Sequence, residues 1–273
     1  EAINTACDKS GRNITDIVSA ALGLAGVRRE DFRLRIRERI AGKLRIDAVE
    51  VVTDADIALY GATKDKAGLV VIAGTGSICL GKNERGEKAF AGGWGPLAGD
   101  EGGGAGIARL ALQAVARASD GRGSPTLLSS KAMEYFRAGK PDDLVVAIYA
   151  PQIDNLKIAG FARLVVEAAV AGDCVALQIL TDAGRELGTA ATAVTKRLKL
   201  EKRKFPIAKV GSIFRAGQII TEPLLETVQK VAPKAYLIEP LQPPAVAAAQ
   251  MALAMFRARE GRQKQKAAVT REN

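Results

Sequence analysis

The sequence predicts an α/β protein, because three kinds of segment recur along it. Short apolar runs rich in β-branched residues predict buried strands. Longer segments with apolar residues three and four positions apart predict amphipathic helices. Glycine-rich stretches follow several of the strands, at the place where open α/β sheets bind their ligands. This mixture of strands, helices and glycine-rich strand ends is typical of the α/β class.

Four short apolar runs predict buried strands, and two further segments predict a β-hairpin. The hairpin segments, Ile78 to Gly81 and Lys88 to Ala91, flank the turn-forming sequence Asn83-Glu84-Arg85-Gly86. The four single runs are Val49 to Thr53, Leu69 to Ala73, Ile207 to Val210 and Tyr236 to Ile238.

Apolar stripes predict helices at Gly106 to Ala118, Phe161 to Ala168 and about Val175 to Leu198. In the last and longest of these, Gly184 stands within the apolar stripe. A glycine in a helix costs about 1 kcal/mol relative to alanine. We therefore expect another part of the molecule to approach the helix backbone closely at this point.

Two basic segments carry most of the net charge of +10. Lys196 to Lys204 has six cations against one anion, and residues 257–273 have six against two. A nucleic-acid surface would place aromatic side chains among such cations, but aromatic residues are only 4% of this chain. We expect a solvated helix end and a frayed tail instead. No run approaches the roughly 20 apolar residues of a membrane helix, so neither nucleic acid nor membrane is predicted as a partner.

Residue usage limits the available chemistry. The chain has no histidine, which excludes Ser-His-Asp and Cys-His catalysis. Cys7, Cys79 and Cys174 are scattered and have neither disulfide-framework nor zinc spacing. The remaining candidates are Asp, Glu, Lys, Ser and Thr side chains, backbone amides and a hard cation.

Two of the predicted strands run directly into polar or glycine-rich residues. Asp54 follows Val49 to Thr53 and is either a ligand-binding carboxylate or a cap of the helix Ala55 to Tyr60. Gly74-Thr75-Gly76-Ser77 follows Leu69 to Ala73, and its amides and hydroxyls could turn toward an anion or simply form a tight turn.

A P-loop is not predicted, although Gly76 to Lys82 has the right glycine and lysine spacing. Asn83 stands where the magnesium-binding Ser or Thr is required. The segment between is also strand-like, whereas a P-loop leads into a helix.

The densest glycine run, Gly92 to Gly104, has seven glycines in thirteen residues around the only tryptophan, Trp94. Asp100 in this run could cap the following helix, but so many glycines exceed what a cap requires. Further on, Gly211 and Ser212 follow the predicted strand Ile207 to Val210.

Taken in order, the motifs TDA, GTGS, GGWG-x-x-x-GDEG and VGSIF and a Pro-Pro-Ala helix identify a resemblance. The chain resembles the N-acetylglucosamine kinase branch of the sugar kinase/Hsp70/actin superfamily and the related BadF/BadG/BcrA/BcrD ATPases, from about Asp47 to Met255. The resemblance implies two ribonuclease H-like α/β lobes with ATP in the cleft between them. The lobes would be residues 1–66, incomplete at the N-terminus, and residues 67–273.

The same resemblance implies a role for each motif. Asp54 would be the catalytic aspartate that accepts the proton of the sugar 6-hydroxyl. Mg²⁺ would be bound through the ATP phosphates and water, with no direct protein ligand. The sugar-binding residues would be Gly93, Trp94 and Asp100, and the ATP-binding residues Gly74, Thr75, Gly76, Ser77, Ala183, Gly184, Gly211 and Ser212, with Ala183 and Gly184 on a helix packed against the nucleotide.

Two features depart from the family pattern. Ile78 follows GTGS where some members have a sugar-binding Asn, which leaves selectivity for an N-acetyl sugar open. No glycine-rich first phosphate hairpin stands upstream of Asp54, and the chain begins at Glu1 rather than Met. We therefore expect that the first lobe lacks its start, and that residues 1–273 alone bind ATP weakly and have an aggregation-prone first lobe.

The resemblance implies a cytoplasmic ATP-dependent kinase of N-acetylglucosamine or glucosamine, with a homodimer possible. One alternative is an ATPase that activates a partner enzyme, but Cys7, Cys79 and Cys174 lack the spacing of the iron–sulfur ligands found in such systems. The other alternative is a non-catalytic sugar-sensing module, which an attached DNA-binding domain would favour.

Overall fold

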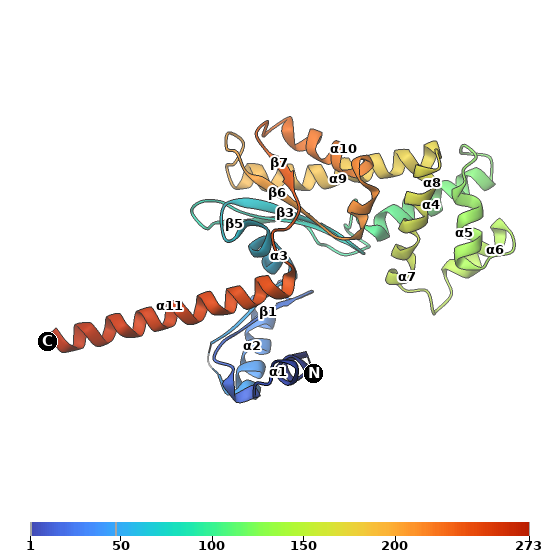
Figure 1. Ribbon diagram of the computed structural model, residues 1–273. Helices are drawn as coiled ribbons and strands as arrows, with labels where there is room; N and C mark the ends of the chain where they lie inside the picture. The colour runs from blue at the N-terminus through green and yellow to red at the C-terminus, as the bar shows by residue number, and fades with distance from the viewer. Residues whose placement is uncertain (1, 47, 273) are drawn as a thin grey trace. The chain divides into compact units, whose positions relative to one another are not determined.

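The computed structural model describes residues 2–46 and 48–272 and divides the chain into two compact units (Figure 1). The first unit consists of residues 1–65 and 241–273, and the second of residues 66–240. The prediction assigned all residues after 66 to the second part. The structure differs from it at the C-terminus, because residues 241–273 belong to the first unit.

The first unit is built on a two-stranded parallel sheet of β1 (Ala20–Leu24) and β2 (Val49–Thr53). Its small core joins Val27, Val49 and Val51 with partly buried side chains of α2. The strand β2 was predicted with these bounds. The strand β1 was missed, because AALGL contains no β-branched residue. The helices of this unit are α1 (Ala2–Ser10), a 3₁₀ turn η1 (Ile14–Asp16), α2 (Glu30–Leu44), α3 (Asp54–Thr63) and α11 (Pro244–Glu272).

The C-terminal helix α11 joins the first unit by packing on α3 and β1. Ala247 is fully buried there, and a Cβ at Gly61 of α3 would lie 2.9 Å from the Ala247 methyl group. Ser19 Oγ also donates a hydrogen bond to the Ala252 carbonyl (3.0 Å). The helix runs to Glu272, so the expectation of a frayed tail over residues 257–273 was wrong for the part that the structure describes.

The second unit contains a five-stranded sheet in the order β5-β4-β3-β6-β7. The strands β3 (Gly68–Ala73), β4 (Ser77–Lys82) and β5 (Lys88–Gly92) are antiparallel, and β6 (Pro206–Val210) and β7 (Tyr236–Ile238) run parallel to β3. All five strands and the hairpin were predicted. Ile72 lies opposite Val210, so the carboxyl ends of β3 and β6 are neighbours at one edge of the sheet.

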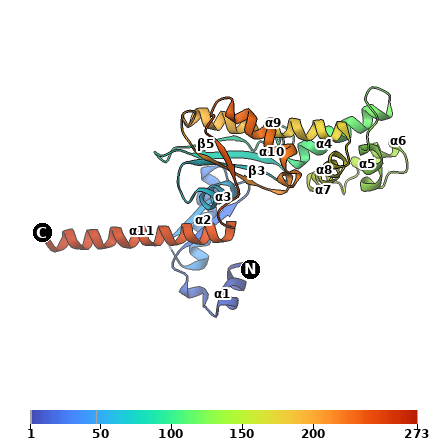
Figure 2. The same ribbon diagram turned by 45° about the horizontal axis from the view of Figure 1, so that its top comes forward.

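Helices cover this sheet on one face and extend beyond one end of it. The helices α9 (Cys174–Arg197) and α10 (Gln218–Gln229) lie along the face (Figures 1 and 2). A second group of helices lies at the end. These are α4 (Gly104–Ser119), α5 (Leu128–Phe136), α6 (Pro141–Ile148), α7 (Asn155–Gly160) and α8 (Ala162–Val170), and a 3₁₀ turn η2 (Ser212–Ala216) follows β6. Large buried side chains of the common core include Leu69, Ile107, Phe161, Leu180 and Ile220.

Gly184 is the point at which α9 and α10 meet. A Cβ at this position would lie 2.7 Å from Pro223 Cγ and about as close to the Ile220 carbonyl oxygen, both on α10. The close backbone approach predicted from the sequence is therefore confirmed, and its partner is α10. The packing of the two helices accounts for the glycine without a nucleotide.

Within the described residues, no single helix has both the length and the apolarity to cross a membrane. Two helices joined at a bend of 118°, residues 155–170 and 174–197, reach that length and composition only together. Phe161, Val165 and Leu180 from these helices are fully buried in the core of the second unit.

Candidate functional site

The turn between β3 and β4 contains the predicted phosphate loop. Gly74 N–H donates to the Gly76 carbonyl (3.0 Å) across the turn. The first turn of α4 fixes the loop, because Gly104 N–H donates to the Gly74 carbonyl (2.8 Å) and Ala105 N–H to the Thr75 carbonyl (2.9 Å). In the part of the chain that the structure describes, the amides of Thr75 and Gly76 make no such bond. They are therefore available to an anion.

Asp100 connects the glycine-rich run after β5 to this loop. It is only 7% exposed, and its Oδ1 accepts a hydrogen bond from Ser77 N–H (3.1 Å). Ser77 Oγ in turn donates to the Glu101 carbonyl (2.7 Å). The alternative role as a side-chain cap was wrong, because Gly103 is the N-cap residue of α4. The two residues joined by the Asp100–Ser77 hydrogen bond are 23 positions apart, and no local pattern in the sequence predicts the contact.

Gly211 brings the end of β6 against the end of β3. Its φ of 118° is a region that only glycine enters readily. A Cβ at this position would lie 2.6 Å from the Ala73 carbonyl carbon and 3.1 Å from Gly74 N. The absence of a side chain thus lets η2 begin at Ser212 directly beside the phosphate loop. Two of the motifs predicted to bind nucleotide are in this way brought together.

A cavity of about 550 Å³ lies beside both motifs. Its volume is within the range of small-molecule sites. Its wall joins the phosphate loop and η2 to side chains of α5, α7 and α8. The lining residues are Gly74, Thr75, Tyr135, Leu156, Ala159, Gly160, Ala162, Arg163, Val166, Glu167, Ser212, Ile213 and Arg215.

Sequence reasoning missed most of this lining, including Tyr135, Arg163, Glu167 and Arg215. Three of these side chains come from α5 and α8, which carry no motif. Arg215 is different, because it follows Ser212 by three positions in VGSIFRAG and so had a positional signal. Ala183 and Gly184, predicted to contact the nucleotide, are not part of this lining.

Trp94 is 65% exposed on the segment between β5 and α4. Its side chain is therefore not part of the buried core. Ile78 of β4 lies against the same segment, since a Cβ at Gly93 would lie 2.9 Å from Ile78 Cδ1. Arg109 of α4 donates to the Pro96 carbonyl and holds the tip of the segment. Contact of Gly93 and Trp94 with a sugar remains a prediction.

In the first unit, β2 places Asp54 at the first position of α3. The cap of this helix is made by its neighbours, since Thr53 Oγ1 accepts Asp56 N–H (3.1 Å) and Asp56 Oδ2 accepts Thr53 N–H (3.1 Å). Asp54 is exposed, and its Oδ1 accepts Ala55 N–H (2.9 Å). The predicted capping role is therefore performed by other residues, and Asp54 presents a carboxylate at the carboxyl end of a strand.

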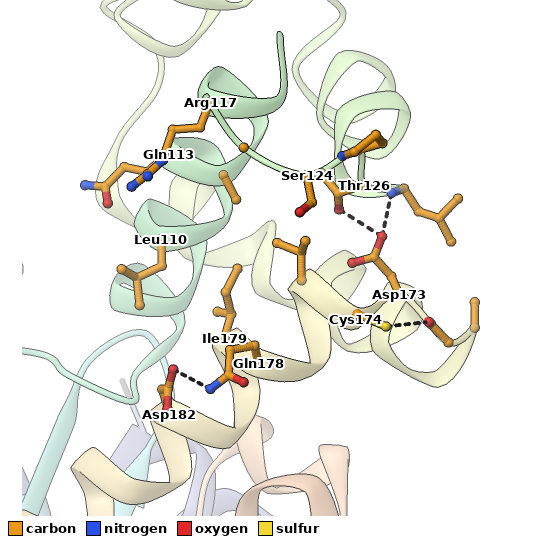
Figure 3. A pocket seen from close by; sticks show the side chains of 17 residues that line it. Leu110, Gln113, Arg117, Ser124, Thr126, Asp173, Cys174, Gln178, Ile179 and Asp182 are labelled. Atoms are coloured by element: carbon orange, nitrogen blue, oxygen red, sulfur yellow. Dashed lines mark hydrogen bonds between the residues drawn. The ribbon is translucent and has the colours of Figure 1, made fainter. Parts of the chain in front are cut away.

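A larger cavity, of about 1020 Å³, lies elsewhere in the second unit, between α4, the start of α5 and the start of α9 (Figure 3). Its most buried charge is Asp173, which accepts hydrogen bonds from Thr126 Oγ1 (2.9 Å), Leu127 N–H (2.6 Å) and Ala176 N–H (2.8 Å). Burial alone would raise the pKa of Asp173, but these hydrogen bonds outweigh it and lower the pKa. This carboxylate therefore joins two helices, and the cavity contains none of the predicted site residues.

The remaining candidates for covalent or metal chemistry are few. Cys79 is fully buried in the sheet, and burial raises the pKa of its thiol, so it is not a thiolate nucleophile. Among the described residues, no three His, Cys, Asp or Glu side chains gather as a metal site.

The chain is an α/β protein with the actin-like ATPase fold, and the Gly74–Ser77 turn, Gly211 and the adjoining cavity form its candidate nucleotide site. The chain belongs to the BadF/BadG/BcrA/BcrD ATPase family, whose model matches residues 1–252. It is 33% identical over 213 residues to the N-acetylmuramic acid/N-acetylglucosamine kinase of Clostridium acetobutylicum, covering 78% of this chain and 70% of that protein.

Two further relatives agree with this assignment. The N-acetyl-D-glucosamine kinase of Dictyostelium discoideum is 33% identical over 253 residues, covering 91% of this chain and 79% of that protein. A crystal structure of a proposed N-acetylglucosamine kinase from Chromobacterium violaceum superposes with a TM-score of 0.66 at 25% identity. It covers 89% of this chain and 79% of that one.

Proposed function

We propose that this protein is an ATP-dependent kinase that transfers the γ-phosphate to the 6-hydroxyl of an amino sugar. The observation that carries the proposal is the meeting of the Gly74–Ser77 loop with Gly211 and Ser212 beside a cavity of about 550 Å³. The two relatives at 33% identity, which are named as kinases of N-acetylated amino sugars, support the substrate class. ATP as the donor favours the cytoplasm as the place of the reaction.

Phosphoryl transfer requires positioning and charge neutralisation more than covalent chemistry. In this proposal the free amides of Thr75 and Gly76 stabilise the moving phosphoryl group. Asp100 holds the loop in shape through Ser77 N–H, and its other carboxylate oxygen hydrogen-bonds a sugar hydroxyl or a cation-bound water. The chemistry thus needs neither the absent histidine nor the protonated Cys79.

Asp54 is the proposed group that accepts the proton of the sugar 6-hydroxyl. Its exposed position at the end of β2, with the capping of α3 done by Thr53 and Asp56, leaves it available for this role. A carboxylate is a weak base near neutral pH. We therefore expect Asp54 to act mainly by orienting the hydroxyl, with the proton leaving late in the reaction.

Mg²⁺ fits the site as a cation carried by ATP, because it usually keeps several of its waters. The Asp100 carboxylate and the Thr75 hydroxyl would hydrogen-bond such waters rather than bind the cation directly. When bound, it supplies neutralisation of charge on the phosphates.

Trp94 and Gly93 are the proposed sugar-facing residues. An exposed indole on a glycine-rich segment offers a flat apolar surface that backbone atoms can flank. Ile78, which lies against Gly93, occupies the position after GTGS that would otherwise offer a polar side chain. If the substrate carries an N-acetyl group, Ile78 would offer that group apolar contact rather than a hydrogen-bonding amide.

The test is sugar-dependent release of ADP by the purified protein with ATP and Mg²⁺. N-acetylglucosamine, N-acetylmuramic acid, glucosamine and glucose are offered separately. The proposal expects turnover with at least one amino sugar and little without sugar. ATP hydrolysis that ignores all four sugars would contradict it and favour a partner-activating ATPase. Sugar binding without turnover would favour a sensing module.

A further inference from the structure

The cavity beside the phosphate loop is lined by three charged side chains, and only one is without a partner. Arg163 Nη1 lies 2.8 Å from Glu167 Oε1, and Lys131 Nζ lies 3.3 Å from the other oxygen of the same carboxylate. Arg215 makes no ion pair or side-chain hydrogen bond with any side chain that the structure describes. The net positive charge of the cavity wall therefore comes from Arg215.

The backbone of Arg215 is held in place by its own turn. It stands in η2 between Ile213 and Ala216, whose side chains are buried in the core of the second unit. Gly217 closes the turn, with its N–H donating to the Phe214 carbonyl (3.1 Å). The Arg215 guanidinium is exposed. Because the backbone of the turn is already fixed, a ligand that binds this guanidinium has to order only the arginine side chain.

The chemistry of the surrounding wall indicates what that ligand is. Toward α7 and α8 the lining includes the apolar side chains of Leu156, Ala159 and Val166 beside the Arg163–Glu167 ion pair, and Tyr135 supplies an aromatic ring. Toward the sheet it is formed by the phosphate loop. A ligand with a flat apolar part at one end and phosphates at the other matches both regions, and Arg215 belongs to the η2 turn beside the loop.

We propose that Arg215 binds the phosphate nearest the ribose of the nucleotide and so sets the affinity of this protein for adenine nucleotides. The inference rests on the proposed function, because it places the nucleotide in this cavity. The proposed function assigns the terminal phosphoryl group to the Thr75 and Gly76 amides. Arg215 lines the same cavity as the apolar residues that would hold the nucleoside. We therefore assign Arg215 to the phosphate attached to the nucleoside. A guanidinium binds phosphate through charge-assisted, often bidentate hydrogen bonds.

The test compares binding of ATP, ADP, AMP and adenosine to wild-type protein and to Arg215→Gln by calorimetry, without sugar. We expect affinity for all three phosphorylated ligands to fall about 10-fold or more, as loss of a charge-assisted contact predicts. Affinity for adenosine should be unchanged. Arg215→Lys should recover part of the loss, since it restores the charge without the fork.

Arg203→Gln is the matched control, because Arg203 is an exposed arginine of the same unit that pairs with Glu84 and lies outside the cavity lining. It should bind all four ligands as the wild type does. Unchanged AMP binding in Arg215→Gln, or an equal loss for adenosine, would overturn the proposal. These measurements need no sugar, so a lack of sugar phosphorylation would refute the proposed function while leaving the role of Arg215 to be decided by binding.

Discussion

Asp54, Asp100 and Asp173 each stand near a helix start, and each makes a different set of contacts. Asp173 caps α9 through its side chain, Asp100 binds an amide of the phosphate loop, and Asp54 presents an exposed carboxylate. An aspartate before a helix often caps it, and of these three only Asp173 does so. The difference comes from the neighbours, because Thr53 and Gly103 already occupy the N-cap positions of α3 and α4.

Asp54→Asn should lower kcat by about 10²- to 10⁴-fold, because it removes proton acceptance at the sugar hydroxyl. The dissociation constant for ATP should change little. Asp56→Asn is the control two positions away. It weakens the capping box of α3 and should cost roughly 0.5–2 kcal/mol of stability, while kcat per folded molecule is retained. An Asp54→Asn enzyme with more than a tenth of wild-type kcat would refute the assignment.

Trp94 gives a direct optical report of sugar binding, because it is the only tryptophan and is 65% exposed. Covering its indole with a sugar should quench or shift the fluorescence in proportion to occupancy. ATP alone should not. The measurement is a titration with N-acetylglucosamine and glucosamine, with Trp94→Phe as the blank. No response to any amino sugar that the enzyme phosphorylates would place Trp94 outside the sugar site.

At the scale of elements, the packing of α9 on α10 makes a sharp prediction for Gly184. Alanine is the better helix former by about 1 kcal/mol, but its Cβ would meet backbone and ring atoms of α10 at 2.7 Å or less. Such overpacking usually costs about 1–3 kcal/mol, so Gly184→Ala should be destabilising. Gly42→Ala in α2 is the control, since no atom of the described residues lies within 4 Å of its added Cβ. It should be neutral or stabilising in urea denaturation, and the reverse order would contradict the packing.

Asp173 links α9 to the start of α5 (Figure 3), and this link should depend on pH. Asp173→Ala should cost about 0.5–2 kcal/mol near pH 7. The folded-state pKa is lowered from the ordinary 3.8. The stabilisation is therefore fully present above pH 3.8 and is lost as the pH falls through the folded pKa.

Urea denaturation of wild type and Asp173→Ala at several pH values measures this link. The difference in unfolding free energy should be constant from pH 7 to about pH 5 and shrink below about pH 4. Asp182→Ala, which loses an exposed pair with Arg185, should stay within about 0.5 kcal/mol of wild type at every pH. A difference for Asp173→Ala that grows in acid would show that the carboxylate is not the stabilising form.

At the scale of the whole molecule, local patterns predicted the second unit well and the first unit poorly. The strand β3 is continuously apolar and buried, so its pattern is unmistakable, whereas β1 consists of AALGL and lacks a strand signal. The return of α11 to α3 was not predictable, because a helix pattern does not specify its partner.

Only those residues of the candidate site that belong to sequence motifs could be predicted. The glycines at 74, 76 and 211 were found because strand ends and close approaches need glycine. Tertiary contacts between distant segments create the hydrogen bond between Asp100 and Ser77 and place Tyr135 and Arg163 in the cavity lining. Such contacts cannot be predicted from local residue spacing.

The identity of the reaction product tests most directly whether this protein is an amino-sugar kinase. Wild-type protein and Asp54→Asn are each incubated with ATP, Mg²⁺ and the best amino sugar, and the products are assigned by phosphorus NMR coupled to the sugar protons. We expect a phosphate monoester on the sugar 6-oxygen, formed in step with ADP by the wild type and nearly absent with Asp54→Asn. Inorganic phosphate as the only product, with the sugar unchanged, would contradict it.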